Sequence, residues 1–225
     1  AFLKRYKLIY AFYLTLVSFI FYAAWDLRFA GILGFAIIIN FLILRNLNSR
    51  RRFLFVLAIL FNIILLGFFK YYNFFSESLI ALSSSLGLSF ILPSLEVLLP
   101  IGISFYIFKI ISHHFDVFRE RLSPRINLLN YAAYVSFFPQ ITAGPIGRAE
   151  EFYTDLDNIP RSSYSATKVG LLIISGLLKK VILASFIFNF FPNIFALPEN
   201  FSTFDLIMGV LAYGVYLFAD FSGYT

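Results

Sequence analysis

The sequence predicts an all-α polytopic membrane protein, and three observations lead to that prediction. Of the 225 residues, 60% are hydrophobic and only 13% are charged, whereas a soluble domain is about half apolar and a quarter charged. The mean hydropathy is +0.83. The apolar residues also form long uncharged blocks, close to the roughly 17–25 residues that span a bilayer. Blocks this continuous must be helices, because backbone groups in hydrocarbon need partners within the segment and barrel strands would alternate in polarity.

The first part of the chain contains good spans, which lie near residues 8–25, 29–44 and 53–69. The leading block follows Lys4, Arg5 and Lys7 as a signal peptide follows its basic end, but it is too long and reaches Trp25 without a small-residue cleavage site. We therefore expect a retained helix. The stretch 78–95 is only modestly hydrophobic and is expected to be a short surface or re-entrant helix.

The central part is interrupted by proline and glycine, so we expect broken helices near 98–111 and 126–147. Residues 148–162 are the most polar section and are expected to form an ordered loop on the cytoplasmic side. Later helices are expected at 163–198 and 204–223. We therefore expect roughly six to eight helices, transmembrane or re-entrant, in a single membrane domain that comprises residues 1–225. The chain begins with alanine and ends without a polar tail, so we expect a piece truncated at both ends.

The net charge of +6 could suggest a nucleic-acid partner, but the basic residues lie at helix ends rather than on one soluble face. The positive-inside rule explains them better and puts three clusters in the cytoplasm. These clusters are Lys4 to Lys7, Arg45 to Arg52 and Arg119 to Arg125. We therefore expect a lipid bilayer, and no nucleic acid, as the partner. The chain has no cysteine, which excludes disulfides.

Several polar or helix-breaking residues within apolar segments are candidates for a substrate site or tunnel. Pro100, Gly102 and Ser104 would let a neighbouring backbone approach closely, although from the residues alone a kinked helix entry with tight packing is the simpler explanation. Polar groups at the second break need partners or water; the candidates there are Gln140, Gly144 and Pro145.

Two charged positions leave a functional and a structural interpretation open. Asp220 follows a long uncharged run and is a site candidate together with Ser222, since an ionisable group in a membrane segment is a functional hypothesis by default. It could equally cap a helix or pair with a lysine at the interface. Arg148 could meet the phosphates of an acyl donor or simply set topology.

The histidines His113 and His114 suit neither a catalytic triad nor a metal site. Adjacent helix positions point about 100° apart, so the two cannot face one site. We expect them to be structural, near the cytoplasmic headgroups. No metal site is expected in the chain.

Five segments in order resemble the membrane-bound O-acyltransferase family, in the bacterial branch that contains alginate O-acetylase and peptidoglycan O-acetyltransferase. They are Phe69 to Phe75, Pro100 to Tyr106 running into Asp116 to Arg119, Tyr134 to Gln140, Ala143 to Ile146, and Asp220 to Tyr224. The resemblance implies a ring of tilted helices around a tunnel from the cytoplasm. One departure is Lys109, where related sequences usually carry glutamine.

The resemblance also implies a function, with no bound cofactor. The full-length protein would move an acetyl or other short acyl group from a cytoplasmic donor such as acetyl-CoA to hydroxyls of an envelope polysaccharide such as alginate. It would lie in the bacterial inner membrane as a multi-pass protein and work with a periplasmic acyltransferase partner. The family's catalytic histidine lies downstream of Thr225, so the present chain alone is expected to be inactive. Alternatives are D-alanyl transfer to teichoic acid within the same family, a secondary transporter and a noncatalytic scaffold subunit.

Overall fold

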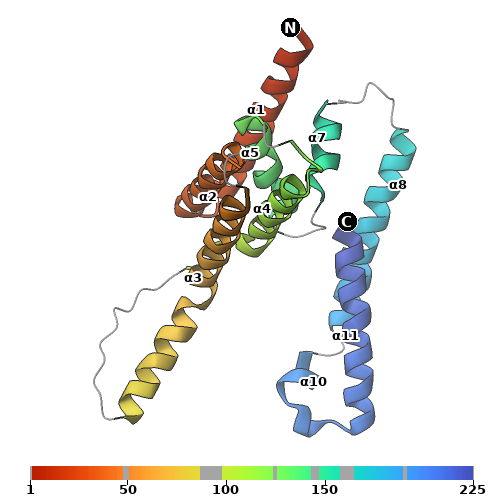
Figure 1. Ribbon diagram of the computed structural model, residues 1–225. Helices are drawn as coiled ribbons and strands as arrows, with labels where there is room; N and C mark the ends of the chain where they lie inside the picture. Colours follow the sequence, from red (N-terminus) through yellow and green to blue (C-terminus); the bar gives the residue numbers. More distant parts are fainter. Residues whose placement is uncertain are drawn as a thin grey trace. The chain divides into compact units, whose positions relative to one another are not determined.

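The computed structural model describes residues 2–47, 51–86, 98–123, 126–142, 147–157, 165–189 and 192–224. Within these ranges the regular elements are all helices (Figure 1). They fall into two units, Ala1–Ile159 and Pro160–Thr225, which are described separately below. The prediction of an all-α membrane protein is confirmed, because four described helices are long and apolar enough to cross a bilayer.

The N-terminal unit begins with the helix pair α1 (Phe2–Ala23) and α2 (Leu27–Arg45). Their connection is tight because Asp26 caps α2: its carboxylate accepts the backbone N–H of Arg28 at 2.8 Å. The side chain of Arg28 also binds this carboxylate, and together these hydrogen bonds hold the pKa of Asp26 below its usual range. The cap satisfies an N–H that the first helical turn would otherwise leave without a partner.

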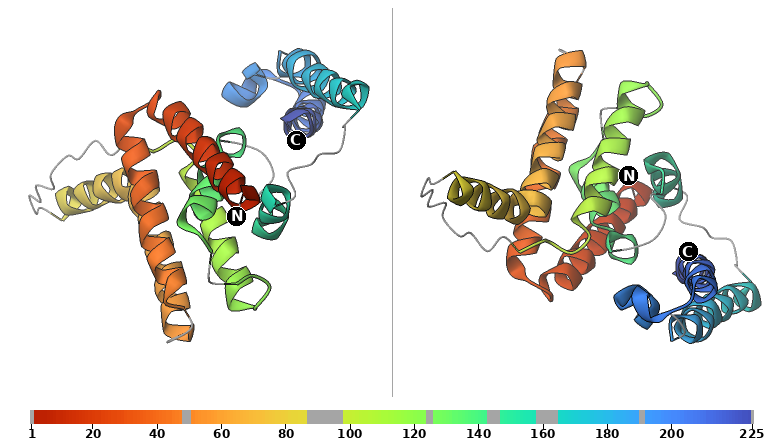
Figure 2. Two further views of the ribbon diagram at one scale, coloured as in Figure 1. Left: turned by 90° about the horizontal axis from the view of Figure 1, so that it is seen from above. Right: turned by 90° about the horizontal axis from the view of Figure 1, so that it is seen from below.

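Helix α3 (Arg51–Ser85) is longer than the expected span at 53–69. It is 35 residues long and includes the first part of the stretch 78–95, which we expected to be a separate helix. Residues 87–97 lie outside the described part. The yellow C-terminal part of α3 turns away from the direction of its orange N-terminal part (Figure 2). The third span and the first half of the surface segment are therefore one helix.

The central part contains α4 (Ile103–Phe118), α5 (Leu128–Ser136), α6 (Phe138–Ile141) and α7 (Ala149–Asp157). Helix α4 begins at Ile103 rather than Leu98 and runs on past residue 111. The expectation of a loop at 148–162 is wrong for residues 149–157. They form a helix because Glu150 and Glu151 favour a helix N-terminus and Leu156 packs on the apolar core.

The core of the N-terminal unit forms around α4, which packs against α2, α3, α5, α6 and α7. Buried side chains of α1 belong to the same apolar cluster. Phe118 at the end of α4 stacks on Phe55 of α3 with ring centroids 4.3 Å apart. The guanidinium of Arg51 covers the Phe118 ring and also contacts the Phe118 carbonyl and the Glu120 carboxylate. The start of α3 and the end of α4 therefore share one end of the unit, which brings two of the predicted arginine clusters together.

The C-terminal unit is a helical hairpin. One arm is continuous and consists of α8 (Ala166–Leu177), a π-helical segment η1 (Leu178–Ala184) and α9 (Ser185–Phe188). After α10 (Pro192–Ala196) and the 3₁₀ turn η2 (Pro198–Asn200), the chain returns as α11 (Thr203–Tyr224). The two long arms lie side by side (Figures 1 and 2). The later helices expected at 163–198 and 204–223 correspond to these arms.

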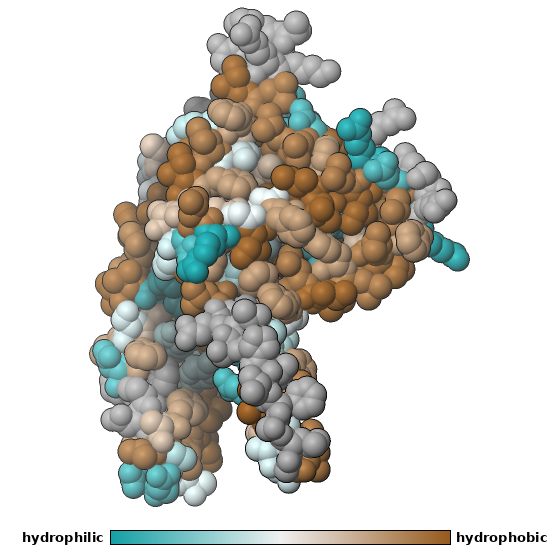
Figure 3. Space-filling model, turned by 90° about the vertical axis from the view of Figure 1, so that its left-hand side faces the viewer, coloured by the Kyte–Doolittle hydropathy of each residue, from teal (hydrophilic) through white to brown (hydrophobic). Residues whose placement is uncertain are grey.

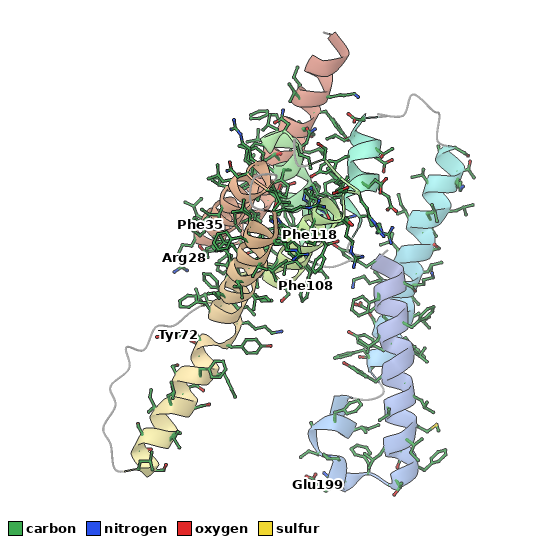
Figure 4. The ribbon with its side chains drawn as sticks, viewed as in Figure 1. Arg28, Phe35, Tyr72, Phe108, Phe118 and Glu199 are labelled. Carbon is green, nitrogen blue, oxygen red and sulfur yellow. The ribbon has the colours of Figure 1, made fainter. Side chains whose placement is uncertain are left out.

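Apolar side chains cover most of the visible face, and polar residues gather in patches (Figure 3). Phe35 on α2 and Phe108 on α4, both labelled in Figure 4, are among many exposed large hydrophobic residues. The helices that satisfy the length and polarity of a membrane span are α2, α3, the arm Ala166–Phe188 and α11. Their exposed apolar surface suits hydrocarbon rather than water as the surrounding solvent.

Candidate functional site at the broken helix

The helix break between α5 and α6 lies at Phe137, whose backbone is extended at φ −48° and ψ 104°. Pro139 two residues later has no N–H to donate, so the helix could not continue with a full set of hydrogen bonds. The carbonyl of Tyr134 has also lost its usual partner, the N–H of Phe138, which instead donates to the Ser18 hydroxyl at 3.2 Å. The break therefore exposes backbone groups inside the unit.

Lys109 on α4 donates a hydrogen bond to the Tyr134 carbonyl that the break leaves without its helical partner. Its ammonium donates to the Tyr134 carbonyl at 2.7 Å and to Gln140 Oε1 at 3.2 Å, so it joins the two sides of the break. The ammonium also lies 4.6 Å from the centroid of the Tyr134 ring, within the range of a cation–π interaction. Lys109 is only 1% exposed, and among the described residues no carboxylate pairs with it. Lys109, named above as a departure from the resemblance, therefore contacts both sides of the break.

The predicted site residue Gly102 meets the same break from the other side. Its φ of +73° is in the left-handed region, and a Cβ built on it would overlap the Ile141 carbonyl oxygen and lie 3.3 Å from the Thr142 Cα. Only glycine fits this conformation and this approach. The preceding residue, Ile101, is held by a hydrogen bond, because its carbonyl accepts the Tyr22 hydroxyl of α1 at 2.5 Å. The structure thus brings Gly102 and Gln140, predicted separately, to one place.

The remaining predicted residues of this unit are placed as follows. Pro100 is buried, Ser104 is half-buried and Arg148 is exposed at the start of α7. The carbonyl of Gly147, next to Arg148, accepts a hydrogen bond from the Tyr134 hydroxyl at 3.0 Å. Gly144 and Pro145 lie outside the described residues.

The two histidines, which we expected to be structural, are buried within the unit. His114 Nε2 lies 2.9 Å from Asn40 Oδ1, which also accepts the Asn62 amide at 2.7 Å. Because that oxygen can only accept, His114 carries its proton on Nε2. This cluster joins α2, α3 and α4.

His113 faces the other way, as the helical geometry predicted. Its Nε2 lies 3.1 Å from the Tyr153 hydroxyl of α7, and the rings of Tyr131 and Tyr134 surround it. Burial raises the pKa of the Tyr153 hydroxyl, which therefore stays protonated and available as a donor. The two histidines join α4 to different neighbours and face no common site.

The interior of this unit contains buried polar atoms that lack a hydrogen-bond partner among the described residues. The hydroxyls of Tyr106 and Tyr131 and the Nδ1 atoms of both histidines are buried without a hydrogen-bond partner among the described residues. Buried polar atoms of this kind indicate ordered water or a ligand. No group of three potential metal ligands occurs in the described ranges.

Asp220 and Ser222 belong to the C-terminal unit and are described apart from the break. Asp220 accepts the ammonium of Lys180 at 2.6 Å, the pairing that the sequence left open as one alternative. Lys180 lies in η1, and π-helical segments are frequent at functional sites. A Cβ built on Gly223 would lie 2.8 Å from the Gly176 carbonyl, so the two arms touch through backbone. The Ser222 hydroxyl is buried there and has no partner in the described part.

Sequence reasoning missed the asparagines of the N-terminal unit and the partners of the two lysines. Asn40 and Asn62 could have been recognised, because an asparagine within an otherwise apolar span commonly binds a neighbouring helix. The partners of Lys109 and Lys180 could not, because they depend on which helices lie side by side. The arrangement at the break offers hydrogen-bond donors in a poorly solvated interior, which suits binding of a carbonyl or an anionic oxygen.

Comparison with known proteins supplies the remaining evidence. The chain is 36% identical to the probable alginate O-acetylase of Pseudomonas syringae pv. tomato, over 94% of this chain and 42% of that protein. It is 31% identical to the peptidoglycan O-acetyltransferase of Helicobacter pylori, over 94% of this chain and 45% of that protein. A teichoic acid D-alanyltransferase of Lacticaseibacillus rhamnosus is 31% identical over 56% of this chain and 33% of its own length. The chain spans less than half the length of these curated relatives. No family model matches it, and no solved structure gives a significant match.

Proposed function

The chain belongs to the membrane-bound O-acyltransferase family, and from this premise we propose that the whole protein transfers an acetyl group, or another short acyl group, to hydroxyls of an envelope polysaccharide. The observation that carries the proposal is the alignment over 94% of the chain with two differently named O-acetyl transfer proteins. The donor would be a thioester such as acetyl-CoA on the cytoplasmic side of the bacterial inner membrane. A periplasmic acyltransferase would be its partner.

The chemistry divides between this chain and the residues that follow it in the longer relatives. A downstream histidine would act as general base on the acceptor hydroxyl. The present chain would supply walls that exclude water from the thioester and donors for the acyl oxygen near Lys109 and Gln140. The catalytic step would therefore require the full-length protein, and residues 1–225 alone would be inactive.

D-alanyl transfer to teichoic acid is the second candidate, supported by the match to the Lacticaseibacillus rhamnosus protein. That match covers 56% of the chain, whereas the O-acetylase matches cover 94%. A secondary transporter would show two related halves with paired broken helices. No internal repeat is visible in the sequence.

The experiment compares the envelope polysaccharides of a strain lacking the gene with those of the same strain carrying the full-length protein. We expect ester-linked acetate, released by mild base and identified by mass spectrometry, to depend on the gene. Ester-linked D-alanine in its place would establish the second candidate. Polysaccharides with identical ester content in both strains would refute acyl transfer.

A further inference from the structure

A cavity of about 410 Å³ lies where the start of α3 meets the end of α4. Its lining includes Arg51 of α3, Glu120 and Arg121 after α4, and Leu47 before α3. Helix α2 ends at Arg45 and α3 begins at Arg51, and both helices are long and apolar enough to cross a bilayer. The two ends that their short connection joins therefore lie at one face of the membrane. This places the cavity at the depth of the lipid headgroups.

The two arginines of the cavity differ in what already binds them. The Arg51 guanidinium lies over the Phe118 ring, 5.2 Å from its centroid, and contacts the Phe118 carbonyl and the Glu120 carboxylate. The Arg121 side chain is exposed and has no hydrogen-bond or charged partner in the described ranges. Two guanidinium groups and one carboxylate line the cavity, so a net positive charge remains. A guanidinium binds phosphate oxygens through paired N–H donors.

The turn after α4 brings Glu120 and Arg121 to the cavity. In this Schellman motif the N–H of Glu120 donates to the Val117 carbonyl at 3.1 Å. The N–H of Arg121 donates to the Asp116 carbonyl at 2.9 Å. The position of Glu120 usually belongs to glycine, because its φ of +61° is in the left-handed region. The side chain of Glu120 is 75% exposed and pairs with Arg51, so a phosphate group on Arg51 can displace this carboxylate into water.

An apolar groove of about 350 Å³ lies between α2 and α3 at the same end of the unit. It begins at Asn46, the neighbour of Leu47 in the cavity, and at Leu54, one turn from Arg51. Apart from Asn46 its lining is apolar and comes from both helices: Ile39, Leu42, Ile43, Leu54, Leu57 and Phe61. Several of these side chains are exposed, so the groove opens toward the hydrocarbon. A groove of this kind below a basic cavity fits an acyl chain below its headgroup.

We propose that this end of the N-terminal unit binds one anionic phospholipid. The lipid phosphate accepts hydrogen bonds from Arg51 and Arg121, and one acyl chain lies in the groove between α2 and α3. The net positive charge of the cavity favours a headgroup without an ammonium, such as phosphatidylglycerol, over a zwitterionic one. The groove favours a lipid over a soluble phosphate compound, which has no long acyl chain to bury. The site is separate from the broken helix and does not depend on the proposed acyl transfer.

The test measures lipid retention by the full-length protein. The purified protein in detergent receives equal amounts of phosphatidylglycerol and phosphatidylcholine with the same acyl chains, and native mass spectrometry counts the bound lipids. We expect the wild type to retain one phosphatidylglycerol in preference to phosphatidylcholine. Arg121→Gln should lower that affinity at least about tenfold, because it removes charge-assisted hydrogen bonds to the phosphate. Equal retention of the two lipids by the wild type would overturn the inference.

Arg52→Gln is the matched control for charge. Arg52 is exposed, follows Arg51 on α3 and does not line the cavity. Diffuse attraction to an anionic lipid would weaken by about fivefold in either variant. A loss for Arg121→Gln no larger than that for Arg52→Gln would therefore overturn the inference.

Leu57→Trp tests the groove, because the larger side chain fills the place of the acyl chain. Ile63→Trp is its control, at an exposed position of α3 outside the groove. We expect lipid retention to fall in Leu57→Trp only, and equal retention in the two variants would overturn the placement of the acyl chain. Excess acetyl-CoA should leave the bound lipid in place. Release of the lipid by acetyl-CoA would assign the cavity to a soluble phosphate compound and overturn the inference.

Discussion

Gly102→Ala is expected to weaken the joint between α4 and the broken helix. Gly102 has φ +73°, and a Cβ built there would overlap the Ile141 carbonyl oxygen and lie 2.9 Å from its carbon. The obstructing atoms are backbone, so no flexible side chain can move aside. Relief requires either a shift of α6 away from α4 or a change in the backbone of residue 102 itself.

The magnitude follows from two costs. A left-handed conformation costs an L-residue with a Cβ about 1–2 kcal/mol, and forcing an extra methyl into a packed contact costs about 1–3 kcal/mol. Together they give about 2–5 kcal/mol, which is a large part of a typical stability of about 5–15 kcal/mol. The loss should also disturb Gln140, which lies next to Ile141 in the chain.

The assay is unfolding of the purified full-length protein in detergent, followed by circular dichroism. Gly67→Ala is the matched control, because nothing lies within 4 Å of a Cβ at that position in α3. We expect Gly102→Ala to unfold at clearly lower denaturant and Gly67→Ala to remain near the wild type. Equal midpoints for the two variants would refute the argument from φ and backbone overlap.

Three further outcomes are expected. Asp220→Asn should lower polymer acylation at normal membrane abundance, because it removes the charge that Lys180 neutralises; unchanged acylation would assign the pair to packing alone. His114→Ala should cost about 0.5–1.5 kcal/mol of stability through the lost hydrogen bond, because the buried Asn40 oxygen then keeps only the Asn62 amide as donor, while acyl transfer per inserted protein is largely retained; a large loss of transfer at normal abundance would contradict this. In intact cells, a cysteine at Ser49 should resist an impermeant thiol reagent and one at Ser76 should react, and the reverse pattern would invert the predicted topology.

The features that the sequence predicted correctly are those that depend on residues close together along the chain. The uncharged blocks predicted helices, and proline predicted the interruption after α5, because a missing N–H ends a helix wherever it lies. Gly102 was a candidate because a small residue lets a neighbouring backbone approach closely. Each of these inferences needs only neighbouring residues along the chain.

The features that escaped prediction depend on packing between distant segments. The ammonium of Lys109 is satisfied by a carbonyl 25 positions away, which no local pattern announces. The loop expected at 148–162 was inferred from its acids, but the apolar positions Phe152 and Leu156 lie four apart, a helical spacing that could have indicated α7. The burial of both histidines likewise depends on which helices pack around α4.

The length of α3 has a consequence for where the bilayer ends. At 1.5 Å per residue, the uncharged stretch 53–69 extends about 26 Å, close to the hydrocarbon thickness of about 30 Å. The helix nevertheless continues to Ser85, so its remaining turns, from Lys70 onward, must leave the acyl chains. Tyr71 and Tyr72 then fall at headgroup depth, where amphipathic rings are most stable. The yellow C-terminal part of α3 turns away from its orange N-terminal part (Figure 2), and such a turn would let the outer part of the helix run along the membrane surface.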